Sequence, residues 1–353
     1  MKALFGTVFP LFVCFSLSAQ EPAVDTVNQR LLFTDGAETE KWLLREHIPA
    51  LGIAYIEDGK ITEAVVYGRN EKGEPYSTRT LFNVASLTKP VTSLVALKLI
   101  HAGKWKLDEP LAGYWTDPDV AEDPRSRQLT TRHVLSHQSG FPNWRPAGGK
   151  LAFEFDPGTG IQYSGEGFEY LRKALEKKFG KTLDQLAQEL IFGPLGMKRT
   201  HFYWNKRVKE EHYAQAYRAD GTRYELRKRR SANAADDLLT TVNDYARLLL
   251  HVIDGAGLNK ALYGEMTAVQ AQIKPRKHWG LGWWVDENVE GEEDALLHGG
   301  DDKGVHTIVF ILPESKKGLL IFTNSDNGTA AYLPAVQHYL GKAGQAIIDI
   351  ETK

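Results

Sequence analysis

A serine and a lysine stand three residues apart in the segment Ser86-Leu87-Thr88-Lys89. If this segment begins a helix, the hydroxyl and the amine lie on one face and within reach of each other. A serine hydroxyl is a poor nucleophile until a base takes its proton, and a lysine whose pKa is lowered by burial can be that base. The backbone N–H of Ser86 can also point at a developing oxyanion. The pair therefore indicates acyl transfer through a serine nucleophile.

The same spacing also has an ordinary structural interpretation. A serine at the start of a helix is a common N-cap, and a lysine in the first turn often lies on the surface. A short motif is therefore a hypothesis that depends on the rest of the chain.

The elements around Ser86 can be predicted from the apolar pattern. Between residues 87 and 101 the apolar side chains follow a helical period, and Gly103 ends the segment, so Ser86 opens a buried helix. Residues 50–67 alternate short apolar runs around an Asp-Gly pair, which predicts a β-hairpin.

The middle of the chain is predicted to be helical, and strands return near the C-terminus. The helical patches are residues 131–137, 167–179, 183–191 and 242–253, and the strand patterns are 282–285, 307–312 and 318–323. We predict an α+β fold, with an antiparallel sheet built from both chain ends, flanking helices and an inserted helical lobe. The predicted ranges are about 20–107 and 272–353 for the α/β lobe and about 108–271 for the helical lobe. The active site is expected between the lobes.

Composition excludes several classes of function. The 353 residues are 42% hydrophobic and 25% charged, which is typical of a globular protein and not of a disordered one. A formal charge of -2 gives no broad basic field for nucleic acid, and the basic run 227–230 is interpreted as a solvated surface stretch. No cofactor and no nucleic-acid partner are predicted, and the oligomeric state is not readable from the chain.

The first 19 residues have the pattern of a secretory signal peptide. Met1 and Lys2 precede an apolar stretch that ends in Ser-Ala-Gln, so the protein is expected to be exported, to the periplasm in our interpretation. No later segment has the length of a membrane span. The single cysteine, Cys14, lies in the apolar stretch after Val13, a poor fit to a lipid-modified cysteine. A mature chain from about residue 20 would have no cysteine, hence no disulfide and no thiolate chemistry.

Five segments in order along the chain resemble one enzyme family. They are Thr80–Lys89; Thr131–Pro142, similar to an RHLLSHTSGLP stretch; Pro157-Gly158 with Tyr163-Ser164-Gly165; Gly193–Met197, similar to a PLGM turn; and His298-Gly299-Gly300. Together they resemble the serine β-lactamases, penicillin-binding proteins and related esterases, in the branch of the class C enzymes and DD-peptidases. The resemblance runs from about residue 48 to 327.

The resemblance implies a β-lactamase/transpeptidase-like fold and a role for each matching residue. Ser86 would be the nucleophile, with Lys89 and Tyr163 as its proton-handling partners and the Tyr163 phenolate favoured by the charge of Lys89. His298, Gly299 and Gly300 would line the substrate site, and the backbone N–H groups of Ser86 and Asp301 would form the oxyanion hole.

Two positions depart from the family pattern. Gly165 replaces an asparagine whose amide holds substrate and lysine, unless Ser164 or Glu166 substitutes for it. Gly299 lacks the threonine hydroxyl that helps to bind the carboxylate of penicillins. Both departures favour small carboxylic esters over D-amino-acid peptides of the cell-wall type, and place β-lactams last among small-molecule substrates.

Other interpretations remain open or are weaker. A non-hydrolytic protein that binds penicillin or peptides would use the same pocket without turnover. His133 and His137 stand four residues apart, but no glutamate lies between them and no third ligand suggests itself, so no metal site is predicted. No G-x-S-x-G motif surrounds any serine. The tryptophans at 279, 283 and 284 are interpreted as core or cleft wall.

Overall fold

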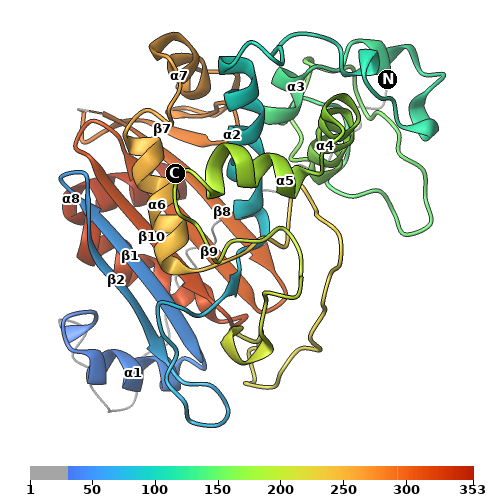
Figure 1. Ribbon diagram of the computed structural model, residues 1–353. Coiled ribbons are helices and arrows are strands. Elements are labelled where there is room, and N and C mark those ends of the chain that lie inside the picture. Colours follow the sequence, from blue (N-terminus) through green and yellow to red (C-terminus); the bar gives the residue numbers. More distant parts are fainter. Residues whose placement is uncertain (1–30, 292) are drawn as a thin grey trace, which may run out of the picture.

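A computed structural model describes residues 31–291 and 293–353. An antiparallel eight-stranded sheet forms its centre, with the strand order β2-β1-β10-β9-β8-β7-β6-β5 (Figure 1). The strands are β1 (Ala50–Glu57), β2 (Lys60–Gly68), β5 (Ala271–Lys274), β6 (Lys277–Trp279), β7 (Trp284–Val289), β8 (Glu293–Asp302), β9 (Val305–Leu312) and β10 (Lys317–Thr323), and a separate pair joins β3 (Phe82–Asn83) to β4 (Leu239–Thr240). The helices are α1 (Gly36–Arg45), α2 (Thr88–His101), α3 (Thr131–Leu135), α4 (Gly165–Phe179), α5 (Leu183–Ala187), α6 (Val242–Ile253), α7 (Lys260–Thr267) and α8 (Tyr332–Thr352).

Both ends of the described chain contribute to the sheet, as the sequence predicts. β1 pairs with β10, with Leu51 opposite Thr323, so strands separated by more than 260 residues lie side by side. The predicted hairpin is confirmed: Asp58 and Gly59 join β1 to β2 with φ angles of 49° and 69°. Positive φ at both positions matches the twist of the flanking strands. The α+β fold class is thereby confirmed.

Two apolar layers cover the two faces of the sheet. Along β1, Leu51 and Ile53 pack in the layer that contains α1 and α8, while Ala50 and Ala54 pack in the layer that contains α2 and α6. Gly52 faces the second layer, where a Cβ would lie 2.6 Å from a methyl group of Val242. Small residues on this face therefore allow α6 to approach β1 closely.

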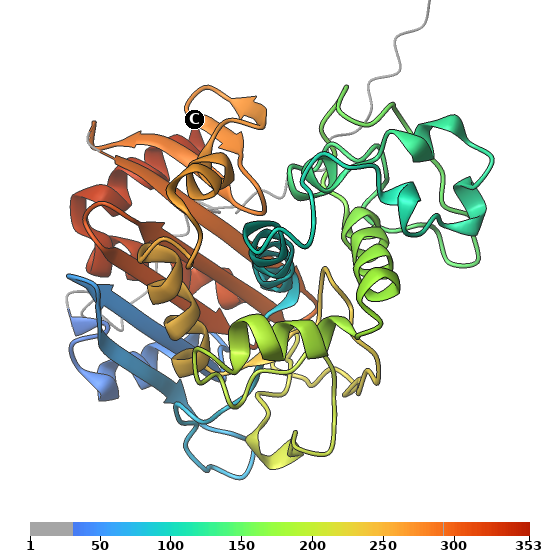
Figure 2. The same ribbon diagram turned by 45° about the horizontal axis from the view of Figure 1, so that its top comes forward.

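The helix that follows Ser86 is the central element of the second layer. Every residue of α2 from Thr88 to Leu97 is buried, which is the property of a helix covered on all sides. The helices α3 to α5 and the loops between residues 108 and 190 gather to one side of the sheet (Figure 2). α3 and α4 differ from their predicted ranges by two residues at one end. α6, from the range predicted for the helical lobe, packs instead in the core beside β1 and β10.

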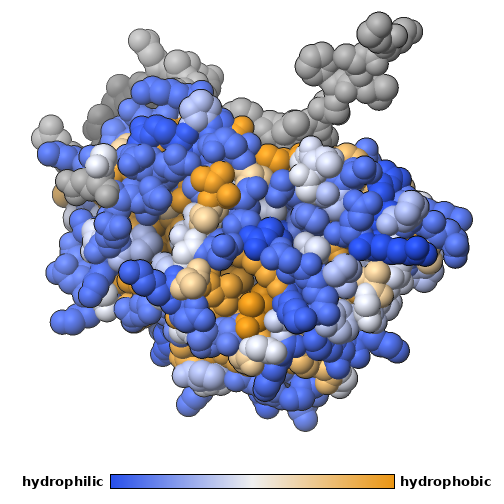
Figure 3. All heavy atoms as spheres, turned by 90° about the horizontal axis from the view of Figure 1, so that it is seen from above, coloured by the Kyte–Doolittle hydropathy of each residue, from blue (hydrophilic) through white to orange (hydrophobic). Residues whose placement is uncertain are grey.

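The surface is mainly hydrophilic. In the view from above, hydrophobic side chains gather in the middle of a largely polar face (Figure 3). Within residues 31–291 and 293–353, we find no helix whose length and apolar content would let it span a membrane. The predicted signal peptide and Cys14 lie outside the described residues.

Candidate active site

Ser86 lies in a tight 3₁₀ turn, Ala85–Leu87, that leads into α2. Ala85 has a φ of 45°, a left-handed conformation that a side chain makes costly. The Asn83 side chain holds this residue by accepting the N–H of Ala85 at 2.8 Å. Ser86 itself is half-buried, and its backbone N–H belongs to the first turn, where the helix provides no partner. The strained turn therefore presents both the hydroxyl and the N–H of Ser86 to their surroundings.

Lys89 lies directly beneath Ser86 and is fully buried. Its Nζ donates to Ser86 Oγ at 3.0 Å and to the carbonyl of Ala235 at 2.9 Å. The proximity predicted from the spacing is present. Burial lowers the pKa of Lys89 to about 7, and the negative charge of Asp236 opposes this effect. Near neutral pH a substantial fraction of Lys89 is therefore an uncharged amine that can accept a proton.

Tyr163 meets Lys89 from the other lobe. Lys89 Nζ lies 4.4 Å from the centre of the Tyr163 ring. The hydroxyl is buried and makes no well-aligned hydrogen bond within the described chain, although Ser86 is near enough to oppose the effect of burial on its pKa. Burial nevertheless raises the pKa of Tyr163 strongly. The expectation that Lys89 would favour a phenolate is therefore wrong for the resting site, because desolvation dominates and keeps Tyr163 a neutral phenol.

His298 lies on β8 and is also buried. Its Nδ1 is 2.7 Å from the carbonyl of Gly299, which can only accept, so Nδ1 carries the proton and Nε2 is an acceptor. Burial, followed by the positive charge of Lys89, lowers the pKa of His298 to about 3. The ring stacks on Trp284 with centroids 5.2 Å apart. A neutral imidazole therefore stands on the β8 wall, with Nε2 free to accept a hydrogen bond.

The two glycines after His298 differ in how much space they have. A Cβ on Gly300 would lie 2.3 Å from the carbonyl oxygen of Val84 and 3.1 Å from the nitrogen of Ser86, so β8 approaches the Ser86 turn as only glycine allows. A Cβ on Gly299 would meet nothing closer than 3.6 Å. Asp301 is the next residue of β8, opposite His306. β8 thus brings Asp301 near the Ser86 turn, and the oxyanion hole formed by the N–H groups of Ser86 and Asp301 stays a prediction.

Asp236 is a member of the site that the sequence did not indicate. The carbonyls of Ala234 and Ala235 accept from Thr92 and Lys89 on α2, at 2.7 and 2.9 Å. Burial raises the pKa of Asp236 to about 7, Asp237 adds to the rise, and Lys89 opposes it. No spacing signal could have found it, because 147 residues separate it from Lys89 and only the fold joins them.

His137 is a second residue whose contacts the sequence did not predict. It stacks on Tyr163, with ring centroids 4.4 Å apart, and its Nδ1 accepts the N–H of Ser164 at 3.0 Å. Trp279 also packs against His137, with ring centroids 4.3 Å apart. His133, by contrast, accepts the N–H of Thr130 at the start of α3. The two histidines therefore do different things, and His137 fixes the ring and backbone around Tyr163.

Neither proposed substitute for the missing asparagine is available. The Ser164 hydroxyl caps α4, because it accepts the N–H of Gly167 at 2.9 Å and donates to the carbonyl of Pro142. Glu166 is paired with Arg145, with the charged atoms 2.8 Å apart. Neither side chain is therefore free to replace the orienting amide that Gly165 lacks.

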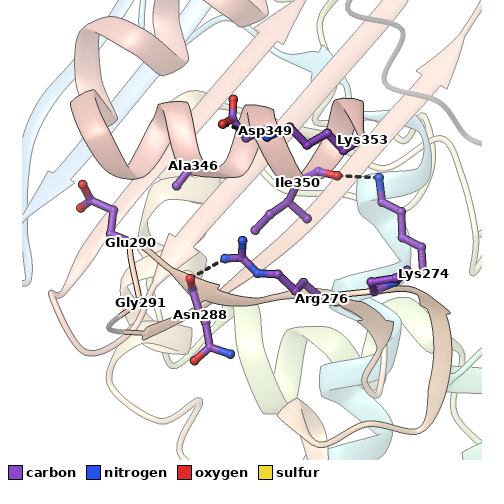
Figure 4. A pocket seen from close by; sticks show the side chains of 10 residues that line it. Lys274, Arg276, Asn288, Glu290, Gly291, Ala346, Asp349, Ile350 and Lys353 are labelled. Atoms are coloured by element: carbon purple, nitrogen blue, oxygen red, sulfur yellow. Dashed lines mark hydrogen bonds and ion pairs between the residues drawn. The ribbon is translucent and has the colours of Figure 1, made fainter.

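Two other features are not assigned a ligand: a carboxylate cluster beside this site and a hollow elsewhere on the molecule. Asp236, Asp237 and Asp302 bring carboxylate oxygens within 4.8 Å of one another, but Asp237 already pairs with Arg229 and accepts from Asn83. A hollow of about 630 Å³ between α8 and the β5–β7 strands shares no residue with the candidate site (Figure 4). The three cations that line the hollow already have partners: Lys274 donates to the carbonyls of residues 350 and 351, Arg276 to those of 287 and 288, and Lys353 pairs with the carboxylate of Asp349.

Comparison with known proteins shows what this chain is similar to. Penicillin-binding protein 4* of Bacillus subtilis (strain 168) is 26% identical over 331 residues, covering 78% of this chain and 68% of the relative. Lovastatin esterase of Penicillium rubens is 27% identical over 204 residues, and the match spans 42% of this chain and about half (51%) of the esterase. The structure of the octameric penicillin-binding protein homologue from Pyrococcus abyssi superimposes with a TM-score of 0.73 at 24% identity, covering 88% of this chain and 77% of the other.

A sequence model of the family described as Beta-lactamase matches residues 29–340, which is most of the chain. The match includes the Ser86 turn, the loop that carries Tyr163 and the β8 strand that carries His298. The resemblance predicted from five short segments is thereby confirmed, and this protein belongs to the β-lactamase family of serine hydrolases.

Proposed function

We propose that this protein is an exported serine hydrolase that forms an acyl-enzyme on Ser86 and acts first on small carboxylic esters, then on D-amino-acid peptides, and least on β-lactams. The observation that carries the proposal is the 3.0 Å contact between Ser86 Oγ and an amine whose pKa is about 7. A base with a pKa near the working pH is the best compromise between being deprotonated and being basic. The predicted signal peptide is the basis for export.

The first half of the reaction transfers the acyl group to the enzyme. Neutral Lys89 takes the proton of Ser86 while Oγ bonds to the ester carbonyl carbon, and the carbonyl oxygen becomes an oxyanion between the N–H groups of Ser86 and Asp301. When the ester C–O bond breaks, the leaving alkoxide takes a proton from the Tyr163 hydroxyl. The Lys89 ammonium then returns a proton to Tyr163, and the alcohol departs.

Water completes the cycle. It loses a proton to neutral Lys89 as it adds to the acyl carbon, and collapse of the second oxyanion breaks the bond to Ser86. Lys89 returns the proton to Oγ, and the carboxylic acid leaves. The net reaction consumes one ester and one water and releases one acid and one alcohol. Tyr163 starts and ends each half as the neutral phenol that its raised pKa favours.

The charges around the site favour esters over substrates that carry a carboxylate. The charge of Asp302 raises the pKa of both Asp236 and Asp301, so acidic groups gather here, and like charges repel a substrate carboxylate. Gly299 offers no hydroxyl to bind such a group. Among the relatives, lovastatin esterase has a name that agrees with ester hydrolysis, and penicillin-binding protein 4* has one that agrees with binding of penicillins.

The test is acylation and turnover by the mature protein with Ser86→Ala beside it. Short-chain aryl esters, nitrocefin and a D-Ala-D-Ala peptide form the substrate panel, and a labelled fluorophosphonate and penicillin report acylation by mass. We expect ester turnover and one acyl mass on Ser86, both absent in Ser86→Ala. Ser315→Ala, an exposed serine between β9 and β10, is the matched control and should behave as the parent. If neither reagent ever acylates Ser86, the protein is a non-hydrolytic binder.

A further inference from the structure

The loop that begins at His137 runs along the segment that carries Tyr163. The carbonyl of His137 accepts the N–H of Gln162 at 2.8 Å, and the carbonyl of Pro142 accepts from the Ser164 hydroxyl at 2.9 Å. One step further, the carbonyl of Asn143 accepts the N–H groups of both residues 165 and 166 at 3.0 Å. The two segments are therefore joined by hydrogen bonds on both sides of Tyr163 along the chain, and residue 144 is held next to residue 165.

Residue 144 is a tryptophan, and its ring occupies the space that Gly165 leaves open. A Cβ on Gly165 would lie between 2.6 and 2.9 Å from three ring carbons of Trp144. A side chain at 165 and the indole in its present position exclude each other. The Trp144 ring thus occupies the space of any side chain at residue 165, and residue 165 follows Tyr163 by two positions.

Trp144 is unusual because it is both exposed and held in place. It is 43% exposed. On one side Asn143 is bonded to α4 through its carbonyl and through Oδ1, which accepts the N–H of Gly165 at 3.0 Å. On the other side the Arg145 guanidinium pairs with Glu166, Asp117 and Asp119 at 2.8 to 2.9 Å. Because the backbone is already ordered, the indole can take part in binding at a small entropic cost.

A second exposed apolar residue lies close to Tyr163 along the chain. Ile161 is 36% exposed and precedes Tyr163 by two residues, as Gly165 follows it by two. Single exposed apolar residues are common, but Ile161 and the Trp144 ring against Gly165 bracket Tyr163 along the chain, which favours an apolar binding surface there.

We propose that Trp144 is a specificity-determining residue that packs against an aromatic or branched apolar group of the substrate beside Tyr163. The inference rests on the proposed ester hydrolysis at Ser86 and adds the class of ester. In this protein the Trp144 ring occupies the space in which a polar side chain of residue 165 would orient the substrate. The enzyme should therefore select esters by apolar bulk and not by a hydrogen-bonded amide.

The test compares two esters that differ only in the apolar group, methyl phenylacetate and methyl acetate, followed by acid release. For Trp144→Ala we expect kcat/KM for methyl phenylacetate to fall ~10-fold, mainly through KM, and that for methyl acetate to change less than about 2-fold. Trp144→Phe should recover part of the loss. Leu44→Ala removes a side chain that is 78% exposed on α1 and should change neither substrate. An equal loss for both esters, or no loss for either, would overturn the proposal.

A double-mutant cycle tests the shared space directly. Gly165→Asn alone must displace the indole, so it should reproduce the loss of selectivity of Trp144→Ala. In the double variant the asparagine has room, and the two effects should not add. Full additivity would mean that the two positions do not compete, and would count against the inference.

A binding measurement separates failure of this inference from failure of the proposed function. On the Ser86→Ala background, where no turnover is expected, an NMR titration with methyl phenylacetate should show ~10-fold weaker binding when Trp144→Ala is added. If the parent hydrolyses no ester but this difference in binding is present, the hydrolase proposal fails and the Trp144 subsite stands. If the parent hydrolyses esters but Trp144→Ala leaves the binding of methyl phenylacetate unchanged, the Trp144 subsite fails and the hydrolase proposal stands.

Discussion

Two buried lysines in this molecule have opposite surroundings. Lys89 has two neutral hydrogen-bond partners, the Ser86 hydroxyl and the Ala235 carbonyl, and burial brings its pKa to about 7. Lys277, on β6, is held by an ion pair with Glu351 near the end of α8, and both side chains are less than 10% exposed. The difference shows that burial alone does not make a lysine a base: a lysine without a direct carboxylate partner can lose its proton, and a lysine tied to one serves as a structural link.

The carboxyl groups near the two lysines follow the same contrast. Burial raises the pKa of Asp236 to about 7 and that of Asp286 to about 8. Asp236 faces Lys89 across the candidate site, whereas Asp286 faces the Lys277 pair, where the charge of Glu351 raises its pKa further. The Trp284 ring lies between the two regions, stacked on His298 and 4.7 Å from Lys277 Nζ. The regions are neighbours, so substitutions can test whether their roles are separate.

The largest effect is expected when the base is removed. Lys89→Met keeps the length and removes the amine, and kcat/KM for an ester should fall by ~10³-fold or more. The melting temperature should hold or rise, because an apolar side chain replaces a buried amine whose partners are neutral. Ester kinetics and thermal melting check the two expectations. Activity within 10-fold of the parent would exclude Lys89 as the base.

The same substitution at the other lysine should have the opposite outcome. Lys277→Met leaves Glu351 and Asp286 buried without their cation, and the free energy of unfolding should fall by ~3 kcal/mol. Once the folded fraction is accounted for, kcat/KM should stay within about 2-fold of the parent. Urea unfolding measures the change in the free energy of unfolding, and ester kinetics at low temperature measure the change in kcat/KM. A large loss of kcat/KM in fully folded protein would show that the two regions are coupled.

A smaller effect should appear in the pH profile of Asp236→Asn. Lys89 accepts a proton only when neutral, so kcat/KM should rise as the pH rises through its pKa of about 7. The negative charge of Asp236 raises that pKa, so its removal should move the rising limb to lower pH by ~1 unit. The matched control is Asp286→Asn, which removes a buried carboxyl from the other region and should leave the limb in place. A limb that moves to higher pH would contradict the assignment.

The sequence predicted well what depends on short range or on repeating pattern. The β1–β2 hairpin, the buried helix after Ser86 and α6 follow from turn residues and apolar period, and the structure shows all of them. It missed the packing of α6 against the sheet, because an apolar stripe indicates burial without naming the partner. Asp236 was missed because its partner Lys89 is far away in the sequence. The contact between Trp144 and Gly165 was missed because a glycine has no side chain whose neighbours a sequence pattern could indicate.

The sequence alone therefore determined the Ser86–Lys89 pair, because three residues at the start of a helix suffice to bring their side chains together. It also determined the family, through five short segments in a fixed order. Only the tertiary structure decided how that pair can react. The pKa of Lys89 depends on burial by two lobes and on Asp236, and the neutrality of Tyr163 and His298 depends on the same exclusion of water. Desolvation is a property of the packed volume around a group, and no local stretch of sequence encodes it.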